Sequence, residues 1–600
     1  MGLRGERLTL EQKVGQLFMV GFDGPSPTEF AREAIEKWGV GGIILFARNY
    51  RDPRQLAALN AEMQELAAKS EACAGIPLFI CTDQEGGAVV RLTGAATVLP
   101  GNMALGATGD AGLAYEAGRV TAAELSATGV NMDLAPVLDV NNNADNPIIG
   151  VRSFGEDPAL VARLGVAFAR GLQDGGVLAT GKHFPGHGDT AVDSHLALPA
   201  VMHERRRLEE VELRPFREAV AAGIGAVMSA HITFPAIDPV AGRPATLSPP
   251  VLTGLLREKM GFGGLIVTDS MEMKAIADNF GAGPAAVMAL EAGADCVLIS
   301  HTPEVQRRSI EAAIEAVRSG RLSLRRVDES VKRVLAAKER FAGGQEGLGD
   351  GHGRPRGEGP AAVGSPEHRA VARAIARRSV TIVQNRGGVL PIAAGAVTPA
   401  HPGLVVEFHS GALSIAEDRI IQAGSLAEAL ARAMGQQRSL RGVALPMDPE
   451  DADIAQVARL AEDAAWIVVA TQKADAFRGQ AALVRRLAAG VTAGVTGSAG
   501  VSGAAGTPAG AVGAPLVVVA LRTPYDLRAF PEIPAFVAAY SFREDSLEAA
   551  ADAILGLAGT TGKLPVSIPG LYQAGHGLTL KESAGAARTS GAGNGEGDVS

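Results

Sequence analysis

The chain up to about residue 340 alternates between short apolar runs and longer segments with a helical pattern. Continuous apolar runs of this length are typical of parallel strands that are buried on both faces. An open doubly wound sheet would show a similar pattern, but eight strand–helix units in this length favour a closed (β/α)8 barrel. The predicted strands are Val14–Phe22, Val40–Phe46, Pro77–Asp83, Val130–Val140, Leu178–Phe184, Ala226–Thr233, Leu265–Asp269 and Asp295–Ser300.

Start signals mark two of the helices between these strands. Asp52 precedes Pro53 and Asp157 precedes Pro158. Aspartate is a favoured N-cap residue, and proline is favoured at the first helical position. In the second of these helices an apolar residue recurs at every fourth position, which predicts one buried face. These residues are Leu160, Leu164, Phe168 and Leu172.

The 600 residues exceed the roughly 250–300 at which a single hydrophobic core stops growing, so a second domain is expected. Residues 1–342 are predicted to form the catalytic TIM-type barrel, and the glycine-rich residues 343–365 a flexible linker. A second α/β pattern over residues 366–582 predicts a smaller α/β sandwich domain. Its predicted strands are Val380–Gln384, Leu404–Phe408, Trp466–Ala470, Leu516–Leu521 and Ala535–Tyr540.

Two further segments are poor in large apolar residues. Residues near 488–514 form a Gly/Ala/Thr/Ser tract, and residues 583–600 have a similar composition. Neither segment can bury much apolar surface. We therefore expect a disordered insertion and a disordered tail.

Charge and cysteine content exclude several classes of protein. The net charge of −9 argues against a nucleic-acid partner, which would require a basic face. The three cysteines, Cys73, Cys81 and Cys296, show no zinc-site spacing, and buried free thiols in a reducing compartment are expected. The chain has neither a signal-peptide pattern nor an apolar run long enough to span a membrane. These features predict a cytoplasmic protein without a membrane partner, and no obligatory protein partner is expected.

Polar residues follow the predicted barrel strands. Active sites of such barrels lie at the carboxyl ends of the strands, so these side chains are expected to face one mouth. The residues in question are Asp83, Asp139, Lys182, His183, His231, Asp269 and His301.

The densest polar segment is Lys182–His195, with the sequence KHFPGHGDTAVDSH. One interpretation is a metal site, because histidine and carboxylate side chains are common ligands. The spacing does not match the helical H-E-x-x-H pattern, and no metal is predicted. The candidate ligands would be His183, His187, Asp189, Asp193 and His195.

A second interpretation is a phosphate-binding loop. Gly176–Lys182 reads GVLATGK and fits the G-x-x-x-x-G-K pattern, but His183 follows where serine or threonine would hold magnesium. The intervening residues already form a predicted strand, so we reject this interpretation.

The third interpretation is acid–base catalysis. Asp193 and His195 are two positions apart, and on an extended chain such side chains point the same way. A carboxylate fixes the imidazole tautomer and stabilises the protonated ring, which can protonate a leaving group and later deprotonate water. Asp269, at the end of a predicted strand, is a candidate nucleophile because a strand end aims its side chain rigidly.

Four motifs resemble glycoside hydrolase family 3, in particular its β-N-acetylglucosaminidase branch. They cover the predicted barrel in order, and the third is the most specific. The motifs are DQEGGAVVRL at 83–92, NPIIGVRSFGEDP at 146–158, KHFPGHGDTAVDSH at 182–195 and LIVTDSMEMKAI at 265–276. A looser resemblance to the family's C-terminal α/β sandwich lies in RSVTIVQNRGGVLPI at 378–392 and GKLPVSIPGLY at 562–572.

The resemblance implies double displacement with retention and without a metal or organic cofactor. Asp269 would form the covalent glycosyl-enzyme, and His195, assisted by Asp193, would act as general acid and then as general base. Ala88 stands where many members carry arginine, but Arg91 is retained. The positions that hold the sugar hydroxyls in the family match Asp83, Arg91, Arg152, Lys182 and His183.

The substrate implied by the resemblance is a saccharide or muropeptide with a terminal β-linked N-acetylglucosamine. Alternatives are a β-glucosidase or β-xylosidase of the same family, and a non-catalytic sugar-binding protein. A β-N-acetylglucosaminide phosphorylase is a further alternative, because a neutral imidazole repels phosphate less than a second carboxylate would.

Overall fold

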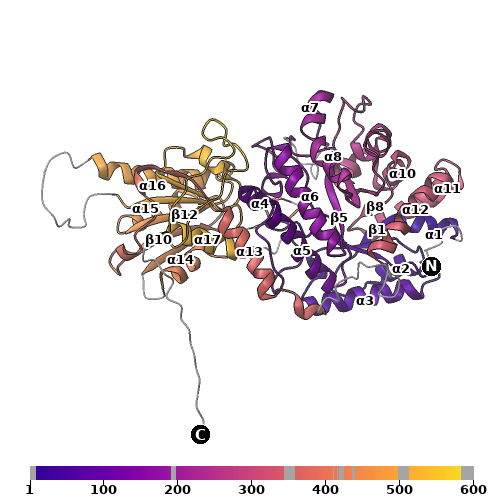
Figure 1. Cartoon of the computed structure of the whole chain (residues 1–600), viewed down its shortest axis with the longest axis horizontal. Coiled ribbons are helices and arrows are strands. Elements are labelled where there is room, and N and C mark those ends of the chain that lie inside the picture. Colours follow the sequence, from indigo (N-terminus) through magenta and orange to yellow (C-terminus); the bar gives the residue numbers. More distant parts are fainter. Residues whose placement is uncertain are drawn as a thin grey trace, which may run out of the picture. The chain divides into compact units, whose positions relative to one another are not determined.

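The structure is a computed structural model that describes residues 8–190, 198–342, 359–409, 411–414, 416–417, 424–435, 439–496 and 513–582. Contacts between Cα atoms divide the chain into two compact units, which are described separately (Figure 1). Unit 1 comprises Met1–Ile375, Gly411–Gln422 and Pro565–Ser567. Unit 2 comprises Ala376–Ser410, Ala423–Leu564 and Ile568–Ser600.

Unit 1 is built on eight parallel strands that follow one another in chain order, with β1 also paired to β8. An isolated bridge between Val267 and Cys296 joins the last two strands. All strand residues are buried, as expected for strands covered on both faces. The predicted (β/α)8 barrel is therefore confirmed. The strands are β1 Phe18–Gly21, β2 Gly42–Leu45, β3 Phe79–Thr82, β4 Met132–Asp133, β5 Leu178–Phe184, β6 Ala226–Ser229, β7 Leu265–Thr268 and β8 Val297–Ile299.

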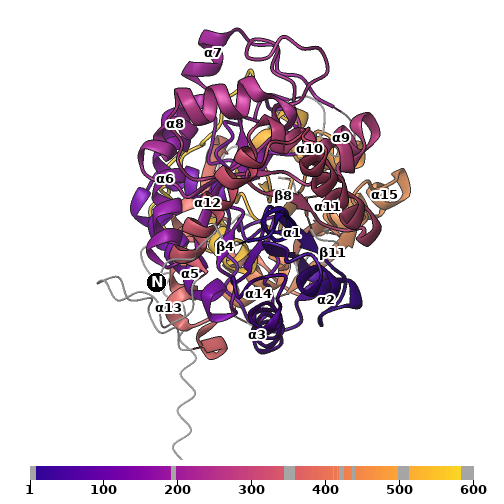
Figure 2. The same ribbon diagram turned by 90° about the vertical axis from the view of Figure 1, so that its right-hand side faces the viewer.

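Helices surround the barrel strands (Figure 2). Asp52 and Asp157 cap α3 and α6 as predicted, because their carboxylates accept hydrogen bonds from backbone N–H groups of the first turn. The α-helices are α1 Leu10–Gly15, α2 Glu29–Glu36, α3 Pro53–Lys69, α4 Asn102–Thr108, α5 Ala111–Ala127, α6 Pro158–Asp174, α7 Arg205–Glu210, α8 Leu213–Ala221, α9 Lys274–Phe280, α10 Ala282–Ala292, α11 Pro303–Arg318 and α12 Leu324–Phe341. Short 3-10 turns include η2 Ala47–Asn49 and η3 Gly150–Arg152, and Pro250–Lys259 is a π-helix.

All predicted barrel strands except β5 are shorter than expected, and two of them differ for a clear local reason. The run Val14–Phe22 begins inside helix α1, because Thr9 and Gln12 form a capping box that starts a helix there. Within Val130–Val140 only Met132 and Asp133 form a regular strand. Pro136 has no N–H to donate, so the regular ladder ends before it. The chain beyond stays beside β5 through separate backbone hydrogen bonds, from the Lys182 N–H to the Pro136 oxygen and from the Leu138 N–H to the Lys182 oxygen.

Unit 2 contains a six-stranded sheet with the order β11-β10-β12-β13-β14-β9, in which only β9 is antiparallel to its neighbour. Helices α15 and α16 lie on one side of the sheet, and α14 and α17 on the other (Figure 1). The predicted α/β sandwich is confirmed. The elements are α13 Pro366–Ser379, β9 Thr381–Asn385, β10 Gly403–Phe408, α14 Leu426–Met434, β11 Leu440–Leu445, α15 Asp451–Ala461, β12 Trp466–Thr471, α16 Arg478–Thr496, β13 Leu516–Ala520, β14 Ala535–Ala538 and α17 Glu544–Ile554.

Unit 2 differs from the sequence prediction in two places. Strand β11 was not predicted, because it lies at the sheet edge and is largely exposed, so it lacks a continuous apolar run. The tract near 488–514, expected to be disordered, is helical as far as Thr496, where alanines continue helix α16. Three stretches lie outside the described part of the chain, namely residues 343–358 of the expected linker, residues 497–512 of the Gly/Ala/Thr/Ser tract, and the expected tail at 583–600.

The burial of the cysteines agrees with the sequence analysis. Cys73, Cys81 and Cys296 are buried and free. Among the described residues, no helix is both long enough and apolar enough to cross a membrane.

Candidate active site

A cavity of about 720 Å³ lies at the carboxyl ends of the barrel strands in unit 1. Its walls include the predicted catalytic and sugar-binding residues that the structure describes, namely Asp83, Arg91, Arg152, Lys182, His183 and Asp269, and also His301. Asp139 and His231, which were also expected to face the mouth, do not line the cavity, because their buried side chains contact His183 and Thr246 instead. The predicted acid–base residues Asp193 and His195 lie outside the described residues. A cavity of this size suits a small organic ligand.

A glycine turn after β3 brings Arg91 back beside Asp83. Gly86 and Gly87 have φ angles of 89° and 59°, which favour glycine, and a Cβ on Gly87 would lie 2.8 Å from the Pro100 oxygen. The two sides of the turn are joined by a 2.9 Å hydrogen bond, which the Arg91 backbone N–H donates to the Gln84 side-chain oxygen. The DQEGGAVVRL motif thus places the Asp83 carboxylate and the Arg91 guanidinium side by side at the mouth.

Asp83 is held between two cations. Its Oδ1 lies 2.7 Å from Lys182 Nζ, and its Oδ2 lies 3.2 Å from Arg91 Nη2. Burial alone would raise the pKa of Asp83, but the charges of Lys182 and Arg91 outweigh burial and lower it. Asp83 is therefore a fixed carboxylate that can accept hydrogen bonds from ligand hydroxyls.

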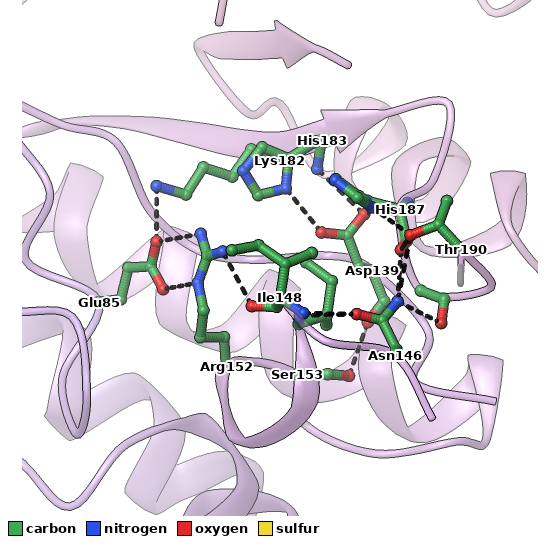
Figure 3. A network of polar contacts seen from close by, with 12 residues as sticks. Glu85, Asp139, Asn146, Ile148, Arg152, Ser153, Lys182, His183, His187 and Thr190 are labelled. Carbon is green, nitrogen blue, oxygen red and sulfur yellow. Dashed lines mark hydrogen bonds and ion pairs between the residues drawn. The ribbon is translucent and has the colours of Figure 1, made fainter. Parts of the chain in front are cut away.

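Glu85 is a pocket residue that the sequence reasoning did not single out. Its two oxygens accept hydrogen bonds of 2.9 and 2.8 Å from Arg152 Nε and Nη2, and Oε1 lies 2.7 Å from Lys182 Nζ (Figure 3). Burial would raise the pKa of Glu85, but the charges of Arg152 and Lys182 lower it to about 2. Its position in DQEGG, two residues after Asp83, is the signal that could have identified it.

Asp139 orients the two histidines of the KHFPGHG segment. Its Oδ2 lies 2.7 Å from His183 Nδ1, and its Oδ1 accepts backbone N–H bonds from His183 and His187 (Figure 3). A carboxylate at Nδ1 places the proton there and leaves Nε2 of His183 for other contacts. Burial and the neighbouring His183 lower the pKa of His187 to about 4, so His187 is neutral near pH 7.

Asp269 follows β7 directly, and the strand end around it is held by His231. The Ser270 backbone N–H donates a 2.7 Å bond to Asp269 Oδ1, and His231 Nε2 lies 2.9 Å from the Ser270 oxygen. The other His231 nitrogen lies 2.8 Å from Thr246 Oγ1. His231 therefore supports the backbone that carries Asp269.

Phe46 and His301 form another wall of the cavity, with ring centroids 5.0 Å apart. Burial and the charge of Arg48 lower the pKa of His301. Ala416 and Glu417 also line the cavity, and Arg91 Nη2 donates a 3.1 Å bond to the Ala416 oxygen. Ala416 and Glu417 belong to unit 1, although they follow strand β10 of unit 2 in the chain. The order of the sequence alone therefore could not place them at this cavity.

The structure gathers different candidate metal ligands from those considered in the sequence. In the described part, ligand atoms of Asp189, His203 and Glu212 lie within 4.8 Å of one another. Of the sequence candidates that the structure describes, namely His183, His187 and Asp189, only Asp189 belongs to this cluster. Arg207 Nη1 already contacts both Glu212 oxygens, at 2.8 and 3.0 Å.

Carboxylates and cations that contact one another line part of this cavity, and apolar side chains such as Ile148 and Leu298 line other parts of it. This combination suits a sugar, which has hydroxyl groups at its edge and C–H groups on its faces. A barrel with such a site and a carboxylate at the end of β7 defines a glycoside hydrolase. The chain belongs to glycosyl hydrolase family 3, because the model of that family's N-terminal domain matches residues 9–337.

Similar proteins agree with this family. A protein from Pseudoalteromonas piscicida named beta-hexosaminidase A is 35% identical over 422 residues, which cover 64% of this chain and 69% of that protein. A beta-hexosaminidase from Nitrosomonas eutropha is 38% identical over 335 residues, which cover 54% of this chain and 93% of the relative. The solved family 3 β-N-acetylglucosaminidase from Paenibacillus sp. strain FPU-7 is 42% identical, with a TM-score of 0.81, and the match covers 94% of this chain and 99% of that one.

Proposed function

We propose that the chain is a retaining exo-β-N-acetylglucosaminidase that removes terminal β-linked N-acetylglucosamine. The observation that carries the proposal is that Asp269 shares one cavity with the Asp83–Lys182–Arg91 cluster. A sugar whose hydroxyls bind that cluster can present its anomeric carbon to a carboxylate aimed from a strand end. The names of the similar proteins support N-acetylglucosamine as the sugar.

In the first step, Asp269 attacks the anomeric carbon while the bond to the leaving oxygen breaks. The transition state resembles an oxocarbenium ion, and the negative charge of Asp269 stabilises it. Protonated His195 gives its proton to the leaving oxygen, and Asp193 stabilises the imidazolium. The product of this step is a covalent glycosyl ester on Asp269.

In the second step, neutral His195 removes a proton from water as the water oxygen attacks the anomeric carbon. The ester bond breaks, Asp269 returns to its carboxylate form, and the sugar leaves with its original configuration. If phosphate replaced water here, the product would be a sugar 1-phosphate. Product analysis in phosphate buffer separates these outcomes, and we expect free N-acetylglucosamine.

The polar side chains that line the cavity would bind the sugar. Asp83 and His183 would accept hydrogen bonds from sugar hydroxyls, and Arg91, Arg152 and Lys182 would donate them. Each of these side chains is already held by a protein partner, so little conformational entropy is lost on binding. We infer that muropeptides or other cell-wall fragments are the natural substrates, and that the enzyme acts in the cytoplasm in peptidoglycan turnover without a cofactor, metal or obligatory protein partner.

The test is release of p-nitrophenol from its β-N-acetylglucosaminide and from its β-glucoside by the full chain. We expect turnover of the acetamido substrate alone, abolished in Asp269→Ala. Turnover of the glucoside alone would instead identify a β-glucosidase. Binding of N-acetylglucosamine without turnover of either substrate would indicate a sugar-binding protein.

A further inference from the structure

Three residues that follow the second sheet in the sequence pack with the barrel unit. Pro565–Ser567, called the strap below, belongs to unit 1, although the residues on either side of it belong to unit 2. The strap lies inside GKLPVSIPGLY at 562–572, a motif to which the proposed catalysis gives no role. Pro565 and Val566 are buried, so the strap is part of the packed interior of unit 1.

Glu156 binds the strap through its side chain and its backbone. The Ser567 backbone N–H donates a 2.7 Å hydrogen bond to Glu156 Oε2, and the Ser567 hydroxyl donates a 2.6 Å bond to Oε1. The Glu156 backbone N–H donates a 3.1 Å bond to the Pro565 oxygen. Hydrogen bonds to a carboxylate are stronger than those between neutral groups. The strap is therefore fixed to Glu156 at both of its ends.

The short stretch between Arg152 and Glu156 is itself firmly held. The Ser153 hydroxyl donates a 2.6 Å bond to the Asp139 backbone oxygen. Ser153 and Phe154 have no exposed surface, so their side chains cannot move without disturbing the core. Because this stretch is packed and hydrogen-bonded, a displacement of Glu156 would also displace Arg152.

Helix α4 connects the strap to the Arg152 turn by a second route. The Asn102 carboxamide donates a 2.7 Å bond to the Arg152 backbone oxygen. Gly106 lies one helical turn further along α4, and a Cβ there would lie 3.0 Å from Pro565 Cβ. A Cβ on Gly155 would lie 2.5 Å from the Pro565 oxygen. The strap thus packs directly on both segments that hold the turn.

We propose that Glu156 and Ser567 are positioning residues for Arg152, so that the strap sets where the guanidinium lies in the cavity wall. Arg152 reaches Glu85 through two hydrogen bonds of 2.9 and 2.8 Å (Figure 3). A planar guanidinium keeps such a paired contact only over a narrow range of backbone positions. The inference rests on the proposed function, in which Arg152 donates a hydrogen bond to a sugar hydroxyl. It gives a segment after the second sheet a role in sugar affinity.

The test compares two matched pairs of variants. Ser567→Ala removes the hydroxyl bond, and Glu156→Ala removes both side-chain bonds to the strap. The control pair is Ser425→Ala and Glu407→Ala in unit 2, where a serine and a glutamate have the same arrangement. Ser425 Oγ donates a 2.7 Å bond to one Glu407 oxygen, and the Leu426 backbone N–H donates a 2.6 Å bond to the other. Both pairs should lose similar stability, so a change in sugar binding distinguishes positioning from a merely structural role.

The measurements are KM and kcat for p-nitrophenyl β-N-acetylglucosaminide and the inhibition constant of free N-acetylglucosamine, all with the full chain. We expect KM and the inhibition constant of Ser567→Ala and Glu156→Ala to rise about 3- to 20-fold. Their kcat should change less than about twofold, because a bond to a hydroxyl away from the reacting bond is equally strong in the ground and transition states. The control pair should keep wild-type values of all three constants.

A double variant tests whether the two residues act as one contact. Glu156→Ala already removes the acceptors of the Ser567 side chain, so adding Ser567→Ala should change the inhibition constant less than about twofold further. Independent effects that multiply would overturn the inference, and so would constants within about twofold of wild type in both single variants. Thermal unfolding shows which variants fold, and Ser567→Ala, which loses one hydroxyl, carries the test if Glu156→Ala does not fold.

Arg152→Lys, measured in parallel, separates this inference from the proposed function. This variant keeps the charge beside Glu85 but loses the planar fork. If Arg152→Lys weakens sugar binding and the strap variants do not, only the positioning inference is wrong. If Arg152→Lys binds the sugar as wild type does, or wild type does not bind N-acetylglucosamine, the proposed sugar contact of Arg152 is wrong and the inference is overturned with it.

Discussion

Lys182 Nζ lies 2.7 Å from Glu85 Oε1, and the two side chains expose only 2% and 1% of their surface. The same ammonium group contacts Asp83, so one cation is shared between two carboxylates. The charges of Asp83 and Glu85 outweigh the effect of burial and raise the pKa of Lys182. A buried charge that loses its partner is strongly destabilising, which makes this relationship testable.

We expect Glu85→Gln to lower the free energy of unfolding by about 3–5 kcal/mol at pH 7, because Arg152 and Lys182 lose a buried countercharge. Chemical denaturation measures this change. The folded pKa of Glu85 is about 2 and lies below its usual value of 4.5. Its stabilisation is therefore present above pH 4.5 and is lost as the pH falls toward 2, so wild type and variant should converge in acid.

The control for this variant is Glu62→Gln. Glu62 lies 2.5 Å from Arg32, but both side chains are more than 40% exposed. Exposed ion pairs contribute between about 0 and 1 kcal/mol. A loss at position 85 no larger than at position 62 would contradict the interpretation of the buried network.

We expect Asp269→Asn to lower kcat by at least about 1000-fold, because the amide is not a nucleophile, while the fold is retained. Stopped assays with p-nitrophenyl β-N-acetylglucosaminide measure this loss. Asp278→Asn on the exposed face of α9 is the control and should keep wild-type activity. An α-configured glycosyl azide formed by Asp269→Ala in azide would identify the displaced nucleophile, whereas retained turnover in both position-269 variants would exclude Asp269 from that role.

Lys338 gives a prediction for the pH dependence of stability. It lies buried in α12, its Nζ donates a 2.7 Å bond to Gln16 Oε1, and burial lowers its pKa from 10.5 to about 7. Between these pH values the unfolded chain binds a proton that the folded chain does not. Stability of the wild type should therefore rise from pH 7 to pH 10, by at most about 1.4 kcal/mol per pH unit from this group.

Lys338→Met, an unbranched side chain of similar length, should remove this rise. The measurement is the difference in the free energy of unfolding between wild type and variant at each pH, because other groups titrate equally in both proteins. The methionine leaves the Gln16 oxygen without this donor, so only the slope and not the absolute level is interpreted. Parallel curves for the two proteins would show that Lys338 is charged in the folded state.

Metal removal should leave turnover unchanged. His203 Nε2 lies 2.5 Å from Asp189 Oδ2, and Glu212 is occupied by Arg207, so the acidic oxygens of this cluster already have cationic or polar partners. We expect full activity after dialysis against EDTA, measured with metal analysis of the dialysed protein. Loss of activity that zinc restores would mean that the cluster binds a metal required for function.

The sequence predicted the barrel well where buried parallel strands leave a continuous apolar signal. β5 has the predicted bounds, and Asp269 stands at the predicted strand end. The predicted strands were wrong in two kinds of place, where a helix-capping motif lies in an apolar run and where a strand is too exposed to be apolar. The capping box at Thr9 turns an apolar run into a helix, and the exposed edge strand β11 carries too few apolar residues to be recognised.

For the candidate site, the motifs identified several of the charged residues but neither Glu85 nor the contacts between these residues. That one cation bridges Asp83 and Glu85, or that Glu156 binds Ser567, depends on distances between segments far apart in the chain. Strand-end reasoning finds residues that follow strands. It does not find residues such as Ala416, which reach the cavity from a distant loop.

The segment Gly411–Gln422 belongs in space to the barrel unit, and the Ala416 oxygen accepts hydrogen bonds from Arg91. A segment that follows β10 in the sequence therefore packs with the barrel unit and not with the sheet that precedes it in the chain. A hybrid gene that exchanges everything after residue 365 for the corresponding part of another family member would also exchange this piece of the cavity wall. Such a hybrid would join Arg91 of this chain to a loop after β10 from the other protein, so a change on either side can alter the contact between Arg91 and the Ala416 oxygen.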